Sequence, residues 1–385
     1  MRPRRLTGAA VATAVLALAA CSSAVSSGSS AAGAPAASAD SSGGATSADV
    51  SAAKTAVAAA AAIPTTIPVS TPLPSAPPKG KTVLFLQCEQ AECGIEAQGM
   101  EAAAKAVGWT VKVLNFQAAN PATLVAALQQ GLQYHPVAAF FSGVPQEAWQ
   151  SEQKAYAAAG AVIVDNFNGT VPTGAGTLAG RGYAAENGPI GTALANEQIA
   201  TSDGAPTKSL IVTVPSYTVF GPMATAYKAQ IAKECPGCQV TEVDLTIPQL
   251  LAGGLDQAVI SAARRISGLQ YIVSVNGQFI GQLPQALNSA GLQGKYKIIS
   301  GSGVSTDQQN VLNGTQLATV SSPYVEDGWQ DIDMAIRHVM NLPIPAGDNV
   351  VPWTLLTKSN IGTPKDSWEA PDNYPQLFKQ LWHVG

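Results

Sequence analysis

Four cysteines stand in two short-range pairs, and their spacing is compatible with three kinds of chemistry. Cys88 and Cys93 are separated by four residues, whereas Cys235 and Cys238 enclose Pro-Gly. Such pairs form disulfides in exported proteins, and a Cys-x-x-Cys pair is also typical of redox sites and of half a zinc site. The second pair follows the expected end of a helix, and the three histidines lie far from both pairs. We therefore predict two local disulfides and neither a metal site nor a cofactor; pairing between the two sites is left open.

The fifth cysteine, Cys21, is a candidate for lipid attachment. It ends the string Leu18-Ala19-Ala20-Cys21, which follows a basic start and an apolar stretch too short to span a bilayer permanently. This pattern is typical of a bacterial lipobox, in which the thiol is lipidated and becomes the new N-terminus after cleavage. The alternative is an ordinary secretory signal with a chance cysteine. We predict a signal peptide over residues 1–20 and a lipid anchor on the extracytoplasmic face of the cell membrane.

A further set of polar and aromatic residues stands directly after predicted strands or at a predicted crossing between domains. Amide, carboxyl and hydroxyl groups donate and accept hydrogen bonds in pairs, and aromatic rings cover C–H surfaces, so this set suits a small hydroxyl-rich solute. For each residue the alternative is a strand-end turn or a filled core position. The expected ligand contacts are Gln90, Glu92, Ser142, Asp165, Asn166, Phe167, Tyr217, Phe220, Asn276, Ser302, Ser322 and Tyr324.

The elements that must position these residues alternate between strand and helix. Residues 82–86 form a continuous apolar run of strand length, as in a strand covered on both faces. Four strand–helix repeats follow from residue 81, and the alternation restarts after a glycine-rich passage that ends near residue 182. This order predicts an α/β fold with two successive doubly wound units, each with a parallel sheet covered by helices.

Composition sets the domain organisation and excludes some functions. The chain has 385 residues, of which 12% are charged, and its net charge of −4 gives no reason to expect nucleic acid as a partner. Residues 21–80 are rich in Ser, Ala, Thr, Gly and Pro, which predicts a low-complexity, flexible stalk with a marginal helix over 50–63. No Gly-x-Ser-x-Gly elbow, Walker loop or His-Glu-x-x-His motif is present, so we expect no enzyme.

Four short strings, in this order and spacing, resemble the type I periplasmic binding proteins of the ribose- and sugar-binding branch. They are Ala161–Asp165, Ala185–Asn187 followed by Gly191, Val273–Gly277 and Trp353–Asn360. The resemblance implies two lobes joined by a three-segment hinge, with an N-terminal lobe of 81–184 plus 323–351. The C-terminal lobe would be 185–322 plus 352–385, including a tail that resembles the extension of actinobacterial members.

The resemblance also implies the partners: a small-molecule ligand, an ABC permease and its ATPase, with the binding protein itself a monomer. A sensing lipoprotein that presents its closed form to a membrane sensor is the alternative. The sequence departs from the sugar-binding pattern, because Asn166, the string Phe220–Met223 and the string Gly301–Gly303 stand where two arginines and an aspartate are usual. These departures predict a neutral or more apolar ligand than a simple pentose or hexose.

Overall fold

The computed structural model describes residues 43–363, 365 and 367–385. The predicted signal peptide, Cys21 and the predicted stalk up to residue 42 therefore lie outside the described residues. Within the described part, no helix combines the length and the apolar character that crossing a membrane requires.

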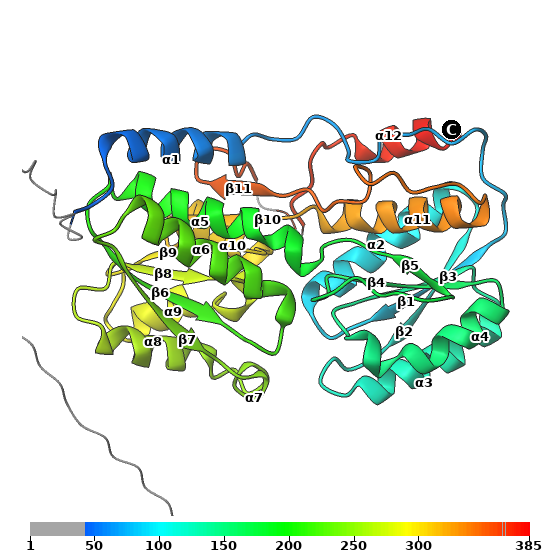
Figure 1. Cartoon of the computed structure of the whole chain (residues 1–385), viewed down its shortest axis with the longest axis horizontal. Coiled ribbons are helices and arrows are strands. Elements are labelled where there is room, and N and C mark those ends of the chain that lie inside the picture. Colours follow the sequence, from blue (N-terminus) through cyan, green and yellow to red (C-terminus); the bar gives the residue numbers. More distant parts are fainter. Residues whose placement is uncertain (1–42, 364, 366) are drawn as a thin grey trace, which may run out of the picture. The chain divides into compact units, whose positions relative to one another are not determined.

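The N-terminal lobe is built on a parallel sheet in the order β2-β1-β3-β4-β5 (Figure 1). Its strands are β1 (Thr82–Gln87), β2 (Thr110–Asn115), β3 (Ala138–Ser142), β4 (Val162–Asn166) and β5 (Thr177–Ala179). Its helices are α2 (Ala91–Ala106), α3 (Pro121–Gly131), α4 (Gln153–Ala158) and α11 (Tyr324–Val339). The central strands β1, β3 and β4 are buried on both faces, which explains their continuous apolar sequences.

The C-terminal lobe repeats this winding in a sheet of order β11-β10-β9-β8-β6-β7. Its strands are β6 (Lys208–Thr213), β7 (Gln239–Asp244), β8 (Tyr271–Ser274), β9 (Lys297–Ser300), β10 (Ala318–Ser321) and β11 (Thr354–Thr357). Its helices are α5 (Gly188–Thr201), α6 (Gly221–Glu234), α7 (Ile247–Leu251), α8 (Leu255–Arg265), α9 (Leu283–Ser289) and α10 (Ser305–Asn313). Strand β11 pairs antiparallel with β10, so this sheet is parallel except at that edge.

The predicted fold class is confirmed: two α/β lobes, each with its own hydrophobic core and a doubly wound sheet. Between β1 and β11 the chain passes from one lobe to the other before α5, between β10 and α11, and between α11 and β11. Some elements differ from the prediction. The sequence predicts one helix over residues 247–266, but the structure interrupts it at Gly253, whose left-handed backbone (φ 66°) ends α7. Helix α10 and the short strand β5 were not predicted.

The prediction of a flexible stalk is wrong for residues 47–80. Residues Ser47–Ala60 form helix α1, which lies along α5 of the C-terminal lobe (Figure 1). The chain then reaches the N-terminal lobe, where Ile67, Val69 and Leu73 are buried in the core. Few large apolar residues are present in this segment, but they are placed at these contacts, and their burial offsets the cost of ordering the chain.

The C-terminal extension also ends on a different lobe from the one we expected. After β11 the chain returns to the N-terminal lobe, where helix α12 (Tyr374–Leu381) packs on α11 (Figure 1). The ring of Trp382 stacks on that of Trp329, with centroids 5.5 Å apart and planes 13° from parallel. The indole N–H of Trp382 donates to Asp333 at 2.8 Å. The extension is thus an integral part of the N-terminal core.

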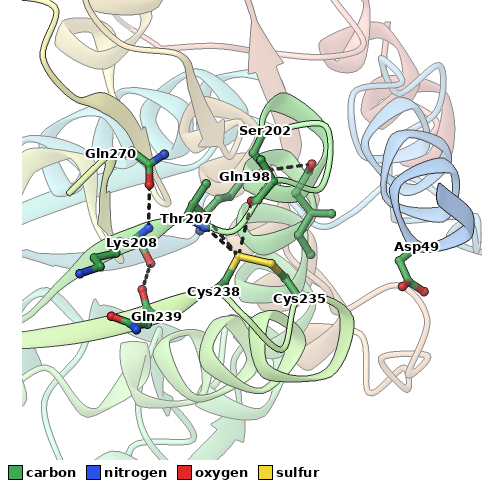
Figure 2. The surroundings of a disulfide bond; sticks show 12 residues. Asp49, Gln198, Ser202, Thr207, Lys208, Cys235, Cys238, Gln239 and Gln270 are labelled. Atoms are coloured by element: carbon green, nitrogen blue, oxygen red, sulfur yellow. Dashed lines mark hydrogen bonds between the residues drawn. A yellow bond between two sulfur atoms is a disulfide. The ribbon is translucent and has the colours of Figure 1, made fainter. Parts of the chain in front are cut away.

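Both predicted disulfides are confirmed. Cys88 and Cys93 join the end of β1 to the first turn of α2, with Cα atoms 5.8 Å apart. Cys235 and Cys238 close the turn between α6 and β7, with Cα atoms 5.3 Å apart. Figure 2 shows this second bond, in which the Sγ of Cys238 accepts a hydrogen bond from the backbone N–H of Thr207 at 3.3 Å. It fixes a turn at the start of β6 and β7.

Candidate functional site

A cavity lies where the strand-end loops of the two lobes face each other. In each sheet the strand order reverses between the first and third strands, β1/β3 in one lobe and β6/β8 in the other. Ligands of open α/β sheets bind at such switch points, beyond the carboxyl ends of the strands. The space inside the cavity that the centres of water molecules can occupy has a volume of about 140 Å³. This corresponds to on the order of ten waters, and therefore to a solute of roughly sugar size.

Ten of the twelve predicted contacts line this cavity. From the N-terminal lobe come Gln90, Glu92, Ser142, Phe167 and Tyr324, and from the second lobe and the crossing at residue 322 come Tyr217, Phe220, Asn276, Ser302 and Ser322. The buried hydroxyl of Ser142 has no hydrogen-bond partner within the described residues. Asn276 accepts from the backbone N–H of Gln278 at 2.8 Å through its side-chain oxygen, which fixes the amide beside the cavity.

Asp165 and Asn166, the remaining two predicted contacts, do not line the cavity. The carboxylate of Asp165 accepts from the side-chain amide of Asn168, and burial raises its pKa well above the ordinary value. The side chain of Asn166 donates to Asp331 at 3.0 Å and accepts from the backbone N–H of Arg181 at 3.1 Å. Both side chains therefore stabilise the end of β4 through hydrogen bonds inside the lobe. Asn168, rather than Asp165 or Asn166, lines the cavity.

Two cavity residues have left-handed backbones, which are unusual outside glycine. Phe167 (φ 50°) follows β4, and Ser302 (φ 45°) follows β9. Such conformations cost free energy and are frequently found where a side chain must be aimed at a ligand. Gly182 (φ 71°) makes room for the ring of Phe167, because a Cβ atom there would lie 2.7 Å from Cε1 of that ring and closer still to Cδ1. The close approach of Gly182 thus fixes the position of the Phe167 ring on that side.

Aromatic rings form much of the wall on the C-terminal lobe. The rings of Tyr217 and Phe279 are stacked with centroids 5.9 Å apart, and Phe220 meets Phe279 edge-on at 6.0 Å. Trp353 lines the cavity from the segment that returns to this lobe, and Tyr324 faces it from the start of α11. These rings provide flat apolar surface with polar groups at the edges of the tyrosines.

Side chains also join the two lobes at the cavity. The amide of Gln278, on the C-terminal lobe, donates to the carboxylate of Glu92 on α2 of the N-terminal lobe. The amide of Gln90 lies 3.4 Å from the hydroxyl of Tyr217, to which it donates. At the hinge, the amide of Asn187 donates to the carbonyl of Val219 at 3.0 Å. The structure therefore represents lobes in contact around the cavity.

Acidic side chains dominate the charges near the cavity. Burial raises the pKa of Glu92, although the hydrogen bond from Gln278 acts in the opposite direction. Glu96, one turn further along α2, is 3% exposed and pairs with Arg181 at 3.4 Å. Burial, and then the negative charge of Asp331, raise the pKa of Glu96 well above its usual range. Glu186 accepts from the backbone N–H groups of Gly182 and Tyr183 at the hinge.

Sequence reasoning missed several residues of the site. Glu96 follows Glu92 by four residues and therefore lies on the same face of α2. Once Glu92 was predicted to line the cavity, this spacing was a signal that Glu96 lines it too. Phe279 stands three residues after Asn276 in the same strand-end loop, which is also a usable signal. Arg181 and Glu186 lie in the glycine-rich passage and the hinge, where neither periodicity nor position after a strand identifies them. The unpredicted residues also include Asn168, Asn187, Thr218 and Trp353.

Comparison with known proteins agrees with the fold. No protein-family model matches this sequence, and no curated protein does either. A similar solved structure is an ABC transporter solute-binding protein from Agrobacterium vitis, bound to α-D-tagatopyranose. Its TM-score is 0.61 at 20% identity, and the match covers 76% of this chain and 100% of that one.

Two further structures match equally well. A sugar-binding protein of a sugar ABC transporter from Bacillus halodurans has a TM-score of 0.61 at 17% identity, covering 74% of this chain and 100% of that one. A solute-binding protein from Burkholderia graminis, in complex with D-arabinose, has a TM-score of 0.61 at 16% identity, covering 76% and 99%. At such identities the similarity establishes the fold, which is that of the type I periplasmic sugar-binding proteins.

Proposed function

We propose that this chain captures a small, sugar-like solute between its two lobes, outside the cytoplasm, and delivers it to an ABC permease. The observation that carries the proposal is the cavity itself. It lies at the switch points of both sheets and is lined by side chains from both lobes. The similar structures are of solute- and sugar-binding proteins of ABC transporters, which favours binding over catalysis.

Capture would work by hinge closure. A solute that contacts Asn276 and Phe279 on one lobe and Phe167 and Ser142 on the other stabilises the state in which the lobes are together. Direct contacts between the lobes, such as that of Gln278 with Glu92, add to the closed state only. Closure also removes the solute from water, which strengthens each hydrogen bond in the cavity.

The location is part of the proposal. A lipid on Cys21 would hold the protein at the outer face of the cell membrane, where disulfides persist. Replacing Cys21 with Ser tests this directly. We expect the variant to leave the membrane fraction or to accumulate as an uncleaved precursor, whereas the parent chain partitions with the membrane. A variant that is processed and retained like the parent would contradict lipid anchoring.

The proposal of delivery to a permease rests on the fold and on the export signal that the sequence predicts. We propose a monomer that docks to a permease in its closed form. Genes for a permease and an ATPase beside this one would support uptake, whereas a gene for a membrane sensor in that place would favour the sensing role.

Capture itself is tested by a thermal-shift screen of the purified full-length chain against sugars, polyols, organic acids and amino acids. A ligand at a hundred times its Kd stabilises the folded state by about 2.7 kcal/mol, which gives a measurable rise in Tm. We expect at least one solute to raise the Tm of the parent and to have no such effect on Asn276→Ala. No shift with any solute would refute capture.

A further inference from the structure

Among the described residues, the side chains that line the cavity include carboxyl groups but no basic group. Glu92, Glu96 and Glu186 line it, and no Lys, Arg or His does among the residues that the structure describes. Glu92 has a neutral partner, the amide of Gln278, so its negative charge is not balanced by a cation. A carboxylate that is partly buried without a counter-charge is costly, and a positive group on a ligand would reduce that cost.

The positive side chain behind this wall, Arg181, is already paired with carboxyl groups of the protein. Arg181 is completely buried behind Glu96, and its guanidinium pairs with Asp331 at 2.5 Å, Glu96 at 3.4 Å and Asp327 at 3.5 Å. One guanidinium thus faces three carboxyl groups. It also donates to the backbone carbonyl of Asp327 at 2.5 Å. Arg181 therefore leaves the region behind the cavity acidic overall and has no free face for an anionic ligand.

The remaining walls suit an organic cation rather than a metal ion. The rings of Tyr217, Phe220 and Phe279 form a packed cluster, and the faces of such rings attract cations. Asn168 and Asn276 supply amide groups for a hydroxyl-rich body. A small inorganic cation would not fill a space of about ten waters, nor would it use the aromatic surface.

We infer that the captured solute is a sugar-sized molecule that carries a protonated amine, with its ammonium group at Glu92 and Glu96. This inference rests on the proposed function and narrows its solute class. It revises the sequence-based prediction of a neutral ligand. That prediction relied on the absence of two arginines and an aspartate that are usual in the sugar-binding pattern. The structure adds two acids to the wall, Glu96 and Glu186, which the sequence had not placed there.

Matched pairs of probes test the inference on the full-length chain. D-Glucosamine, D-galactosamine and D-mannosamine are titrated beside their hydroxyl parents and their N-acetyl forms, at a pH that keeps the amines protonated. We expect at least one amine to bind ten times or more tightly than both of its neutral partners. Glu92→Gln should reduce that preference at least tenfold, whereas Glu89→Gln, an exposed neighbour outside the cavity wall, should retain it.

The outcomes separate this inference from the proposed function. If the neutral sugars bind as tightly as the amines or more tightly, the inference of an amine ligand is wrong, while the proposal of solute capture stands. A preference that survives unchanged in both Glu92→Gln and Glu96→Gln would also overturn it, provided that both variants keep the parent's Tm. If neither the amines, their neutral partners nor the wider solute screen gives binding, the amine inference and the proposed function are both wrong.

Discussion

The side-chain amide of Gln278 donates a hydrogen bond to the carboxylate of Glu92, and the two residues belong to different lobes. Gln278 lies in the short helical turn after β8, and the side chain of Asn276 caps this turn by accepting from the backbone N–H of Gln278. Glu92 lies in the first turn of α2, next to the Cys88–Cys93 disulfide. Each partner is therefore held by its own lobe, and the bond forms only when the lobes are together.

Loss of this bond should weaken capture without weakening either lobe. A hydrogen bond to a charged group contributes about 1.5 kcal/mol or more, so we expect Gln278→Ala to reduce solute affinity roughly tenfold. The Tm without solute should stay at the parent value. Gln285→Ala, at an exposed position on α9, is the matched control and should bind like the parent. Equal affinities for the two variants would show that the bond does not stabilise the closed form.

Gly182→Ala should reduce binding by displacing an aromatic side chain. The added Cβ would collide with the ring of Phe167, and the left-handed backbone at this position disfavours alanine by about 1–2 kcal/mol. Gly268→Ala separates the two effects, because Gly268 has a similar φ of 75° and open space around it. Titration should show weaker binding for Gly182→Ala alone, while both variants lose stability. Parent-like affinity of Gly182→Ala would mean that Phe167 does not contact the solute.

The stability of the N-terminal lobe should fall as the pH rises, owing to Glu326. Burial first, and then the negative charges of Asp327 and Glu369, raise the pKa of Glu326 to about 9. In the unfolded chain the group ionises near pH 4.5, so the folded protein binds more protons between these values. The contribution is fully present below pH 4.5 and is lost as the pH rises through about 9.

Glu326→Gln should therefore flatten this pH dependence. Thermal unfolding at pH 5.5 and pH 8.5 should give a smaller fall in Tm for Glu326→Gln than for the parent chain. Glu101→Gln, on the exposed side of α2, should follow the parent. If the fall is the same in all three proteins, Glu326 is not the group that binds the extra proton.

Leu73→Ala tests the finding that residues 47–80 are part of the folded body. Leu73 is 2% exposed in the core of the N-terminal lobe, and its backbone N–H donates to the carbonyl of Leu381 at 2.9 Å. Truncating a core leucine costs about 2–5 kcal/mol, so a clear fall in Tm is expected. Ile63→Ala, at a residue 46% exposed, should change the Tm little. A flexible stalk would instead leave both variants at the parent Tm.

The layout of the site was predictable because parallel sheets carry a strong sequence signal. Strands buried on both faces read as continuous apolar runs, as in β1 and β4, and the ends of such runs mark the loops that bind ligands. This rule located Tyr217, Asn276 and Ser302 at the cavity without any structural information.

The errors came from tertiary contacts, most of which join residues that lie far apart in the sequence. Asp165 and Asn166 do end β4, but Asn166 is drawn inward by Asp331, 165 residues later, and Asp165 by Asn168. The segment before β1 has the composition of a linker, and its tertiary contacts, among them those with α5, α11 and Leu381 of α12, order it. Neither local propensity nor hydrophobic periodicity carries information of this kind.

One measurement tests capture in the interlobe cavity most directly: a calorimetric titration of the best solute from the screen into three forms of the chain. Ala118 lines the cavity, whereas its neighbour Ala119 is exposed and does not. We predict that the parent and Ala119→Trp each bind one solute per chain with similar affinity, and that Ala118→Trp shows no measurable binding while retaining the parent's Tm. Binding by Ala118→Trp with the parent's affinity would contradict capture in this cavity.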